Sequence, residues 1–524
     1  MSDIIVSKKD EVHLVVKPND SGIIMELSEF FTFYVPGYKF VPSYRNKIWD
    51  GKIRLYNTRD YTLPGGLLYH LSKFVESRGY STDVPDNLIK KLFGGDRSPK
   101  FLQWMSGDKH LDLNLHVNGK PAKPRDYQIN AVHHILKYQK ALLVSPTGSG
   151  KSLIIYTLAM HVLDNTGWNI LIIVPTTSLV EQMFKDFLDY GGTNPHGTVG
   201  HIITEKDIHR IYSGKEKNNY DARITITTWQ SVYKLPESWF EKFGAVVGDE
   251  AHLFKAKSLT TVMSKLKNAY IRVGTTGTLD GTKVHKLVLE GCFGPVYNVT
   301  STKKLIESKT LSDVSIDVLH MQYSDAEKKA FGRKTYQEEI SYIVQHEQRN
   351  KFIRNLALAQ KGNTLVLFNL VETHGKPLFK SIKDKAGNDR KVFYVSGEIK
   401  TEEREEIREA TEKENNAIIV ASIGTFSTGI NIRNLHNLIF SSPTKSQIRV
   451  LQSLGRSLRK ADNGQPAKVY DLCDDFSWKT RKNYTLGHGI ERIGIYEKEE
   501  LNFKTYPVPI SQDKTSQKTI GDLQ

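Results

Sequence analysis

The chain has 524 residues, a formal net charge of +15, 39% hydrophobic and 25% charged residues. This length exceeds one ordinary core and predicts about three domains, and the positive charge favours a polyanionic partner, with nucleic acid before an acidic membrane surface. The two cysteines, Cys292 and Cys473, lie far apart, which argues against a disulfide framework or a cysteine zinc site. No run approaches about 18 apolar residues, so we expect a soluble cytoplasmic protein without a membrane partner.

Residues 1–105 carry a patch in which aromatic and basic side chains interleave between Phe30 and Tyr61. Its basic members include Lys39, Arg45, Lys47, Lys52 and Arg54. Aromatic faces stack on bases and cations contact phosphates, which favours an accessory nucleic-acid-binding domain. Ordinary strand alternation is an equally good interpretation, because residues 52–57 alternate with period two between turns at residues 50–51 and 64–66.

After a stretch rich in glycine and proline, the sequence RDYQ at residues 125–128 precedes an apolar-periodic helix at residues 131–136. The amide of Gln128 can pair with both a donor and an acceptor on an adenine edge. A glutamine at a helix start is more commonly a solvated cap, so this short match is weak by itself.

The sequence SPTGSGKS at residues 145–152 lies between an apolar run and a helical pattern, which predicts a strand, a tight loop and a helix. In such a phosphate-binding loop the glycines turn backbone N–H groups towards phosphate oxygens, the lysine reaches the β- and γ-phosphates, and the final serine hydroxyl can bind Mg²⁺. Ser145 replaces the usual first glycine, but the remaining core is intact. The nucleotide-binding candidates are Gln128, Thr147, Gly148, Ser149, Gly150, Lys151 and Ser152.

Two further buried-strand patterns, at residues 169–175 and 224–231, end in polar side chains. Ligands of open α/β sheets bind outside the carboxyl ends of the strands, so the loops with Pro175, Thr176 and Thr228 can hold a nucleic-acid strand. Ordinary helix caps explain these residues equally well.

The sequence AVVGDEAH at residues 245–252 is a buried strand that ends directly in charged residues. Asp249 can hold Mg²⁺ through water, Glu250 can orient or deprotonate the attacking water, and His252 can relay to a neighbouring segment. Another strand at residues 271–276 leads into a hydroxyl-rich turn. The charged stretch at residues 301–350 predicts an exposed helical linker.

A second α/β unit is predicted over residues 351–475, without a phosphate-binding loop of its own. A hydroxyl-rich loop with Thr425 and Thr428 follows its third strand. A helix at residues 445–460 places Arg456 and Arg459 on one face, from which they can reach the γ-phosphate of the first unit's nucleotide. A merely solvated basic face is the alternative. The tail, residues 476–524, ends in a polar segment that is expected to be partly disordered.

In chain order, the motifs RDYQ, SPTGSGKS, VPTTSLVEQ, TTWQS, GDEAH, TGT, ASIGTFSTGIN and QSLGRSLR resemble those of a superfamily 2 helicase of the DEAH type. They cover residues 125–459. The whole chain, its N-terminal region included, is similar to the recombination helicases of T4-like bacteriophages. The resemblance implies two RecA-like parallel-sheet domains in tandem, at residues 106–300 and 351–475, with a smaller N-terminal α+β accessory domain.

The resemblance also implies roles for single residues. Gln128 would read adenine, Lys151 and Ser152 would bind phosphate and metal, and Asp249 and Glu250 would hold Mg²⁺ and activate water. Thr276 and Thr278 would couple the site to the nucleic acid. The remaining catalytic candidates are His252, Gln452, Arg456 and Arg459, and the backbone contacts are Pro175, Thr176, Thr228, Thr425 and Thr428. His252, Gln452 and the Thr-Gly-Thr turn depart from the pattern of RNA helicases of the DEAD type.

We therefore predict an ATP- and Mg²⁺-dependent DNA helicase that remodels forks, four-way junctions, D-loops and RNA–DNA hybrids in recombination, repair and replication, acting as a monomer. One alternative is a translocase that moves along duplex DNA without separating its strands. Another is an annealing or architectural nucleic-acid-binding protein whose ATPase is regulatory.

Overall fold

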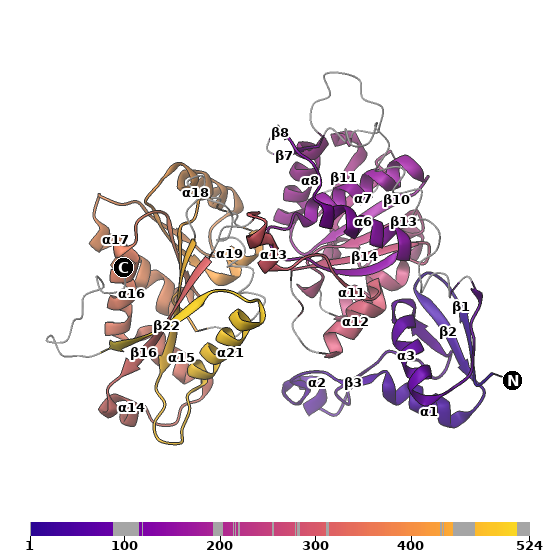
Figure 1. The fold of residues 1–524 in the computed structure, drawn as a ribbon, viewed down its shortest axis with the longest axis horizontal. Helices are drawn as coiled ribbons and strands as arrows, with labels where there is room; N and C mark the ends of the chain where they lie inside the picture. Colours follow the sequence, from indigo (N-terminus) through magenta and orange to yellow (C-terminus); the bar gives the residue numbers. More distant parts are fainter. Residues whose placement is uncertain are drawn as a thin grey trace. The chain divides into compact units, whose positions relative to one another are not determined.

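The computed structural model describes residues 2–510 apart from residues 87, 89–114, 118, 192–202, 213, 215, 218–220, 254–255, 278, 280–282, 311–313, 430–431, 433 and 444–466. The chain forms two compact units (Figure 1). One comprises Met1–Ser145 and Gly150–Thr300, and the other comprises Ser301–Gln524 with the short segment Pro146–Ser149. Within the described part of the chain, no helix combines the length and apolarity that crossing a bilayer requires.

The first unit begins with a small α+β domain, drawn in indigo in Figure 1. Its sheet contains, in spatial order, β5 (Thr62–Pro64), β2 (His13–Pro18), β1 (Ile4–Lys8) and β6 (Thr82–Asp83). Alternate residues of β2 are buried, as expected for a sheet with one face on the core. That face packs against α1 (Ser21–Phe30) and α3 (Leu68–Arg78) through Leu27, Leu71 and Phe74.

A two-stranded ribbon extends this domain and carries most of the basic and aromatic patch. It consists of β3 (Thr32–Tyr34), the 3₁₀ turn η1 (Tyr38–Phe40), α2 (Pro42–Arg45) and β4 (Lys52–Arg54). We call residues 32–54 the basic ribbon.

The rest of the first unit contains a seven-stranded parallel sheet in the order β11-β12-β10-β13-β14-β9-β15. The strands are β9 (Lys140–Val144), β10 (Asn169–Val174), β11 (Ile208–Ile211), β12 (Ile224–Thr228), β13 (Phe243–Gly248), β14 (Ile271–Thr276) and β15 (Val296–Asn298). Because both faces of the sheet are covered, its central strands are almost continuously apolar.

Strand β10 shows how the two faces are filled. Ile170 and Ile172 point into one core, whereas Leu171 and Ile173 point into the other. The first core is closed by α6 (Asp126–Tyr138), α7 (Lys151–Asn165) and α8 (Thr177–Gly191). The second is closed by α9 (Trp229–Val232), α10 (Glu237–Phe240), α11 (Ala256–Lys265) and α12 (Lys283–Phe293).

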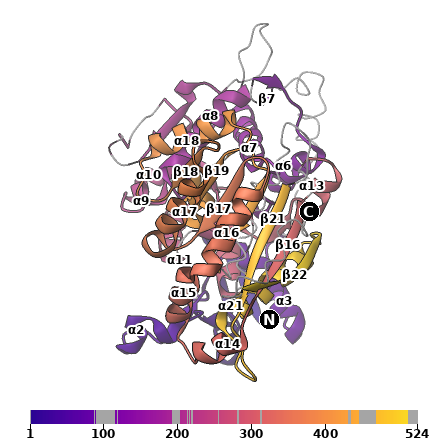
Figure 2. The same cartoon turned by 90° about the vertical axis from the view of Figure 1, so that its left-hand side faces the viewer.

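The second unit repeats this architecture with a parallel sheet in the order β18-β19-β17-β20-β21-β16-β22. Its strands are β16 (Val314–Tyr323), β17 (Thr364–Phe368), β18 (Val392–Val395), β19 (Ile418–Ser422), β20 (Asn437–Phe440), β21 (Ala467–Asp475) and β22 (Phe503–Ile510). Two helices, α16 (Glu347–Ala359) and α17 (Lys376–Ala386), lie across one face of this sheet (Figure 2). The predicted fold class, two RecA-like parallel-sheet domains after an N-terminal α+β domain, is thereby confirmed.

The prediction of an exposed linker at residues 301–350 is wrong for much of that stretch. Residues 314–323 form β16, which pairs with β21 from Val314↔Ala467 to Gln322↔Asp475 and with β22 on its other side. The predicted end of the second α/β unit at residue 475 is also wrong, because α21 (Tyr484–Lys498) packs on β21 and β22 forms the edge of the same sheet. The charged residues of the helices that follow, α14 (Asp325–Phe331) and α15 (Tyr336–Gln345), make the stretch polar on average. The short apolar pattern of β16 was therefore not recognised as a strand.

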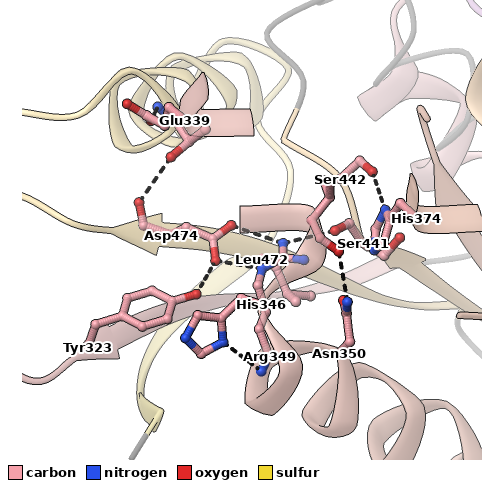
Figure 3. A network of polar contacts seen from close by, with 12 residues as sticks. Tyr323, Glu339, His346, Arg349, Asn350, His374, Ser441, Ser442, Leu472 and Asp474 are labelled. Carbon is pink, nitrogen blue, oxygen red and sulfur yellow. Dashed lines mark hydrogen bonds and ion pairs between the residues drawn. The ribbon is translucent and has the colours of Figure 1, made fainter. Parts of the chain in front are cut away.

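A buried polar network joins the helices of the second unit to the carboxyl ends of its strands (Figure 3). The guanidinium of Arg349 donates to both carboxylate oxygens of Asp474, at 2.7 and 2.9 Å, and to the carbonyl of Ser441 at 2.8 Å. The hydroxyl of Tyr323 donates to the same carboxylate at 2.8 Å. These contacts tie α16 to β20, β21 and β16, because each strand end contributes one partner.

Candidate active site

The loop between β9 and α7 has the conformation that its glycines require. Gly148 and Gly150 have φ values of 85° and 80°, a left-handed backbone that favours glycine. A Cβ atom on Gly150 would lie 2.4 Å from the Gln128 Nε2 atom, so a side chain here would displace the Gln128 amide. The loop leads into the first turn of α7, and the amino end of a helix suits an anionic ligand.

Gln128 lies in the first turn of α6 and is only 3% exposed. Its side-chain oxygen accepts a hydrogen bond from the Arg125 backbone N–H at 2.8 Å, in a capping box. The residue is therefore a helix cap, but a buried one beside the phosphate-binding loop rather than a solvated one.

Asp249 follows β13 and is buried, with its carboxylate accepting a hydrogen bond from Thr275 Oγ1 at 2.5 Å. Burial and the neighbouring Glu250 carboxylate raise the pKa of Asp249 to about 6, because both disfavour the charged form. Thr275 was not among the predicted site residues. The sequence signal that could have identified it was a hydroxyl residue near the end of a neighbouring strand.

Glu250 lies between a cation and an imidazole. Its carboxylate is 3.4 Å from the Lys151 Nζ atom and 3.3 Å from the His252 Nδ1 atom. The backbone of Glu250 has a φ of 47°, a left-handed conformation that is uncommon outside glycine and recurs at functional sites. The structure thus brings together residues from the phosphate-binding loop and from the end of β13.

His252 connects this group to the neighbouring strand. Its Nδ1 atom is 2.8 Å from the Thr276 hydroxyl, and both residues are buried. Because Thr276 ends β14 and His252 follows β13, the contact joins two adjacent strand ends. Thr276 therefore has direct contact with a site residue, and its role in coupling remains a prediction.

The predicted nucleic-acid contacts at the ends of β10 and β12 have local hydroxyl partners. Thr176 Oγ1 is 3.0 Å from Ser178 Oγ, and Thr228 Oγ1 is 2.9 Å from Ser231 Oγ. Pro175 is half-buried at the same end of the sheet. In the second unit, Thr425 Oγ1 accepts a hydrogen bond from Ser422 at 2.8 Å. Their predicted contacts with a nucleic-acid backbone remain predictions.

Several predicted residues lie outside the described part of the chain. They are Thr278, Gln452, Arg456, Arg459 and the side chain of Thr428.

Some aromatic residues of the N-terminal patch belong to the core, and others are exposed as a nucleic-acid-binding surface would require. Phe31 and Tyr56 are core residues, at 0% and 2% exposure. Tyr34 and Phe40, in the basic ribbon, are 52% and 76% exposed. Lys52 lies over the Tyr34 ring at 4.8 Å from its centre, so cations and aromatic faces are interleaved on this exposed segment.

The other predicted cations of the basic ribbon have local contacts or are exposed. Arg54 forms an ion pair with Asp50, and Arg45 donates to the carbonyl of Lys39 at 3.3 Å. Lys47 is exposed just after α2.

Three family models match the chain. The model of DNA helicase UvsW, N-terminal, matches residues 3–85. The model of type III restriction enzyme, res subunit, matches residues 121–281, and the helicase conserved C-terminal domain matches residues 347–461. The three matches follow the order of the N-terminal domain and the two parallel-sheet domains.

Among curated proteins, the ATP-dependent DNA helicase uvsW of Enterobacteria phage T4 is 38% identical, covering 96% of this chain and 98% of its own. The DNA 3'-5' translocase XPB2 of Sulfurisphaera tokodaii is 25% identical over 64% of this chain and 79% of its own. The crystal structure of T4 UvsW matches with a TM-score of 0.51 and 34% identity, covering 97% of this chain and 100% of that one. A restriction-modification enzyme, LlaBIII, bound to DNA matches with a TM-score of 0.55 at 18% identity, covering 75% of this chain and 32% of that one, which shows the fold alone. Because a relative of this identity spans nearly the whole of both chains, the chain belongs to the UvsW family of superfamily 2 helicases.

Proposed function

We propose that the chain is an ATP-dependent DNA helicase that remodels branched DNA, namely forks, four-way junctions and D-loops, and RNA–DNA hybrids. The observation that carries the ATP-dependent part of this proposal is the convergence of Lys151, Glu250 and His252 beside the phosphate-binding loop, with His252 in contact with Thr276. DNA as the substrate is supported by the similarity to the ATP-dependent DNA helicase of phage T4. Such an arrangement connects a nucleotide site to the ends of the strands from which nucleic-acid-binding loops begin.

The oxygen atoms of the site suit a hard divalent cation, which binds carboxylates and hydroxyls. We infer that Ser152 and Asp249 would hold Mg²⁺, which would neutralise charge on the phosphates of ATP when bound. The pKa of Asp249, raised to about 6 by burial, is consistent with a carboxylate that awaits a cation. Lys151 would bind the phosphates, and Glu250 would accept the proton of the attacking water. Gln128, buried beside Gly150, would read the adenine.

Contact with nucleic acid would come from several parts of the chain. The basic ribbon would bind phosphates and bases, since it combines exposed cations with exposed aromatic rings. Thr176, Thr228 and Thr425 would contact the backbone, and Arg456 and Arg459 would sense the γ-phosphate. We expect the protein to act as a monomer.

The test is ATP hydrolysis by the purified chain, alone and with single-stranded DNA, duplex DNA, a four-way junction and single-stranded RNA. We expect DNA to stimulate hydrolysis, with the junction most effective, and we expect junction unwinding that Lys151→Ala abolishes. Stimulation by RNA alone would overturn the proposal.

Two further assays separate the alternatives. Displacement of a triplex strand without separation of a duplex would identify a duplex translocase, and the Sulfurisphaera relative is named a DNA 3'-5' translocase. Unchanged DNA remodelling by Lys151→Ala would identify an annealing protein. An Arg456→Ala variant with wild-type DNA-stimulated hydrolysis would refute the γ-phosphate role of that arginine.

A further inference from the structure

The hydroxyl of Ser152 has a partner outside the sequence motifs. The Ser152 Oγ and Tyr190 Oη atoms are 2.7 Å apart, although the residues are 38 positions apart in sequence. Ser152 lies in the first turn of α7, and Tyr190 lies in the last turn of α8. No motif of the family resemblance includes Tyr190.

Packing fixes the position of the Tyr190 hydroxyl. Its side chain belongs to the buried core of the first unit and is 9% exposed. The ring contacts Tyr156 edge to face, with centroids 5.4 Å apart, and Tyr156 in turn contacts Phe187 at 5.3 Å. Because the Tyr190 ring is buried in this core and packs against Tyr156, its oxygen is presented to Ser152 at one place.

The chemistry of a hydroxyl ligand gives this contact a consequence. A serine hydroxyl has one proton and two lone pairs, and it binds a cation through a lone pair. The proton must then point to an acceptor elsewhere. Tyr190 Oη is such an acceptor at hydrogen-bonding distance, so a Ser152 that donates to Tyr190 keeps its lone pairs for the cation.

We propose that Tyr190 is a positioning residue for the divalent cation of the nucleotide site, acting through the hydroxyl of Ser152. Partners of this kind orient metal ligands, and their loss commonly lowers metal affinity about 10-fold or more. The inference rests on the assignment of Ser152 as a cation ligand in the proposed function.

Tyr190→Phe tests the proposal, because it removes the Oη atom and keeps the ring. The readout is equilibrium binding of a fluorescent ADP analogue during a Mg²⁺ titration, with no hydrolysis involved. We expect the Mg²⁺ concentration for half-maximal effect to rise about 10-fold, with nucleotide binding in EDTA unchanged. Tyr156→Phe is the matched control, since it makes the same change on the neighbouring ring, and should leave the titration at its wild-type midpoint.

The variant Ser152→Ala tests separately whether Ser152 is a ligand of the cation. If Ser152→Ala shifts the Mg²⁺ titration and Tyr190→Phe does not, the role of Tyr190 is refuted and the assignment of Ser152 stands. If neither variant shifts the titration, both are refuted. A lower Mg²⁺ requirement in Tyr190→Phe would mean that Tyr190 competes with the cation, which also overturns the proposal. In support, Tyr190→Phe should add nothing to Ser152→Ala.

Discussion

Asp249 and Glu250 are adjacent in sequence but lie in different electrostatic surroundings. Asp249 is buried beside a second carboxylate, and these two effects raise its pKa to about 6. Glu250 has Lys151 at 3.4 Å, so a cation compensates its charge. The two acidic residues are thereby suited to different tasks: Asp249 to binding a cation and Glu250 to accepting a proton.

We predict that Asp249→Asn stabilises the nucleotide-free protein and that the gain grows with pH. The pKa of Asp249 rises from 3.8 in its ordinary state to about 6 in the folded chain, so the folded state binds more protons between these values. Protonation of Asp249 therefore contributes to the free energy of unfolding. This contribution is fully present below pH about 4 and is lost as pH rises through about 6, which lowers the free energy of unfolding by about 1–3 kcal/mol.

Thermal unfolding of both proteins at pH 4.5 and pH 7.5 checks this prediction. The advantage of Asp249→Asn should be larger at pH 7.5, where the wild-type carboxylate is charged and buried. An equal difference at the two pH values would contradict it. The same variant should lose Mg²⁺-dependent nucleotide binding, because an amide is a poorer ligand for a hard cation.

At the scale of elements, the Arg349–Asp474 pair joins α16 to β21 in the second unit. Both side chains are 0% exposed, and the pair is bidentate, which gives it well-defined geometry. Tyr323 donates to the same carboxylate. A buried charge without its partner is far more costly than an intact pair is stabilising.

We therefore predict that Asp474→Asn destabilises the second unit by about 3–5 kcal/mol. The measurement is the midpoint of urea-induced unfolding of the full chain, followed by circular dichroism. The matched control is Glu347→Gln, which breaks an exposed pair with Lys351 on the same helix. That variant should leave the midpoint unchanged, since exposed pairs contribute little. Equal effects of the two variants would contradict the prediction.

At the scale of the whole molecule, the N-terminal domain is docked closely on the first parallel-sheet domain. The backbone N–H of Glu11 donates to the Lys267 carbonyl at 3.2 Å, and Lys140 Nζ donates to the Glu11 carbonyl at 2.8 Å. His70 contacts Glu290 at 2.9 Å. Because Lys140 begins β9 and the phosphate-binding loop follows the same strand, the domain contacts the strand that carries the nucleotide site.

Gly66 tests this docking. A Cβ atom there would lie 2.0 Å from the Glu290 carbonyl oxygen, so Gly66→Ala should separate the N-terminal domain from α12. We expect faster amide hydrogen exchange on both sides of the contact, in residues 62–67 and in α12, with unchanged exchange in the second unit. Gly167→Ala is the control, since no atom lies within 4 Å of its added Cβ. Wild-type exchange in Gly66→Ala would show that the contact can adjust without opening.

The sequence by itself determined the features that depend on neighbouring residues. The motif SPTGSGKS predicted a strand, a tight loop and a helix, and β9, the loop with Gly148 and Gly150, and α7 follow in that order. Continuous apolar runs predicted β10 and β13, because a parallel strand covered on both faces must be apolar throughout. The motif order predicted the fold class. Local sequence patterns did not predict β16, because its strand pattern is followed directly by charged helices.

Tertiary structure alone decided which distant residues meet. Thr275 contacts Asp249 across 26 positions, Tyr190 contacts Ser152 across 38, and Arg349 contacts Asp474 across 125. His70 and Glu290, from different domains, are 220 positions apart. Residues so far apart share no local periodicity, and their pairing follows from strand order and helix packing. The burial that raises the pKa of Asp249 arises in the same way, because only the folded chain removes water from its carboxylate.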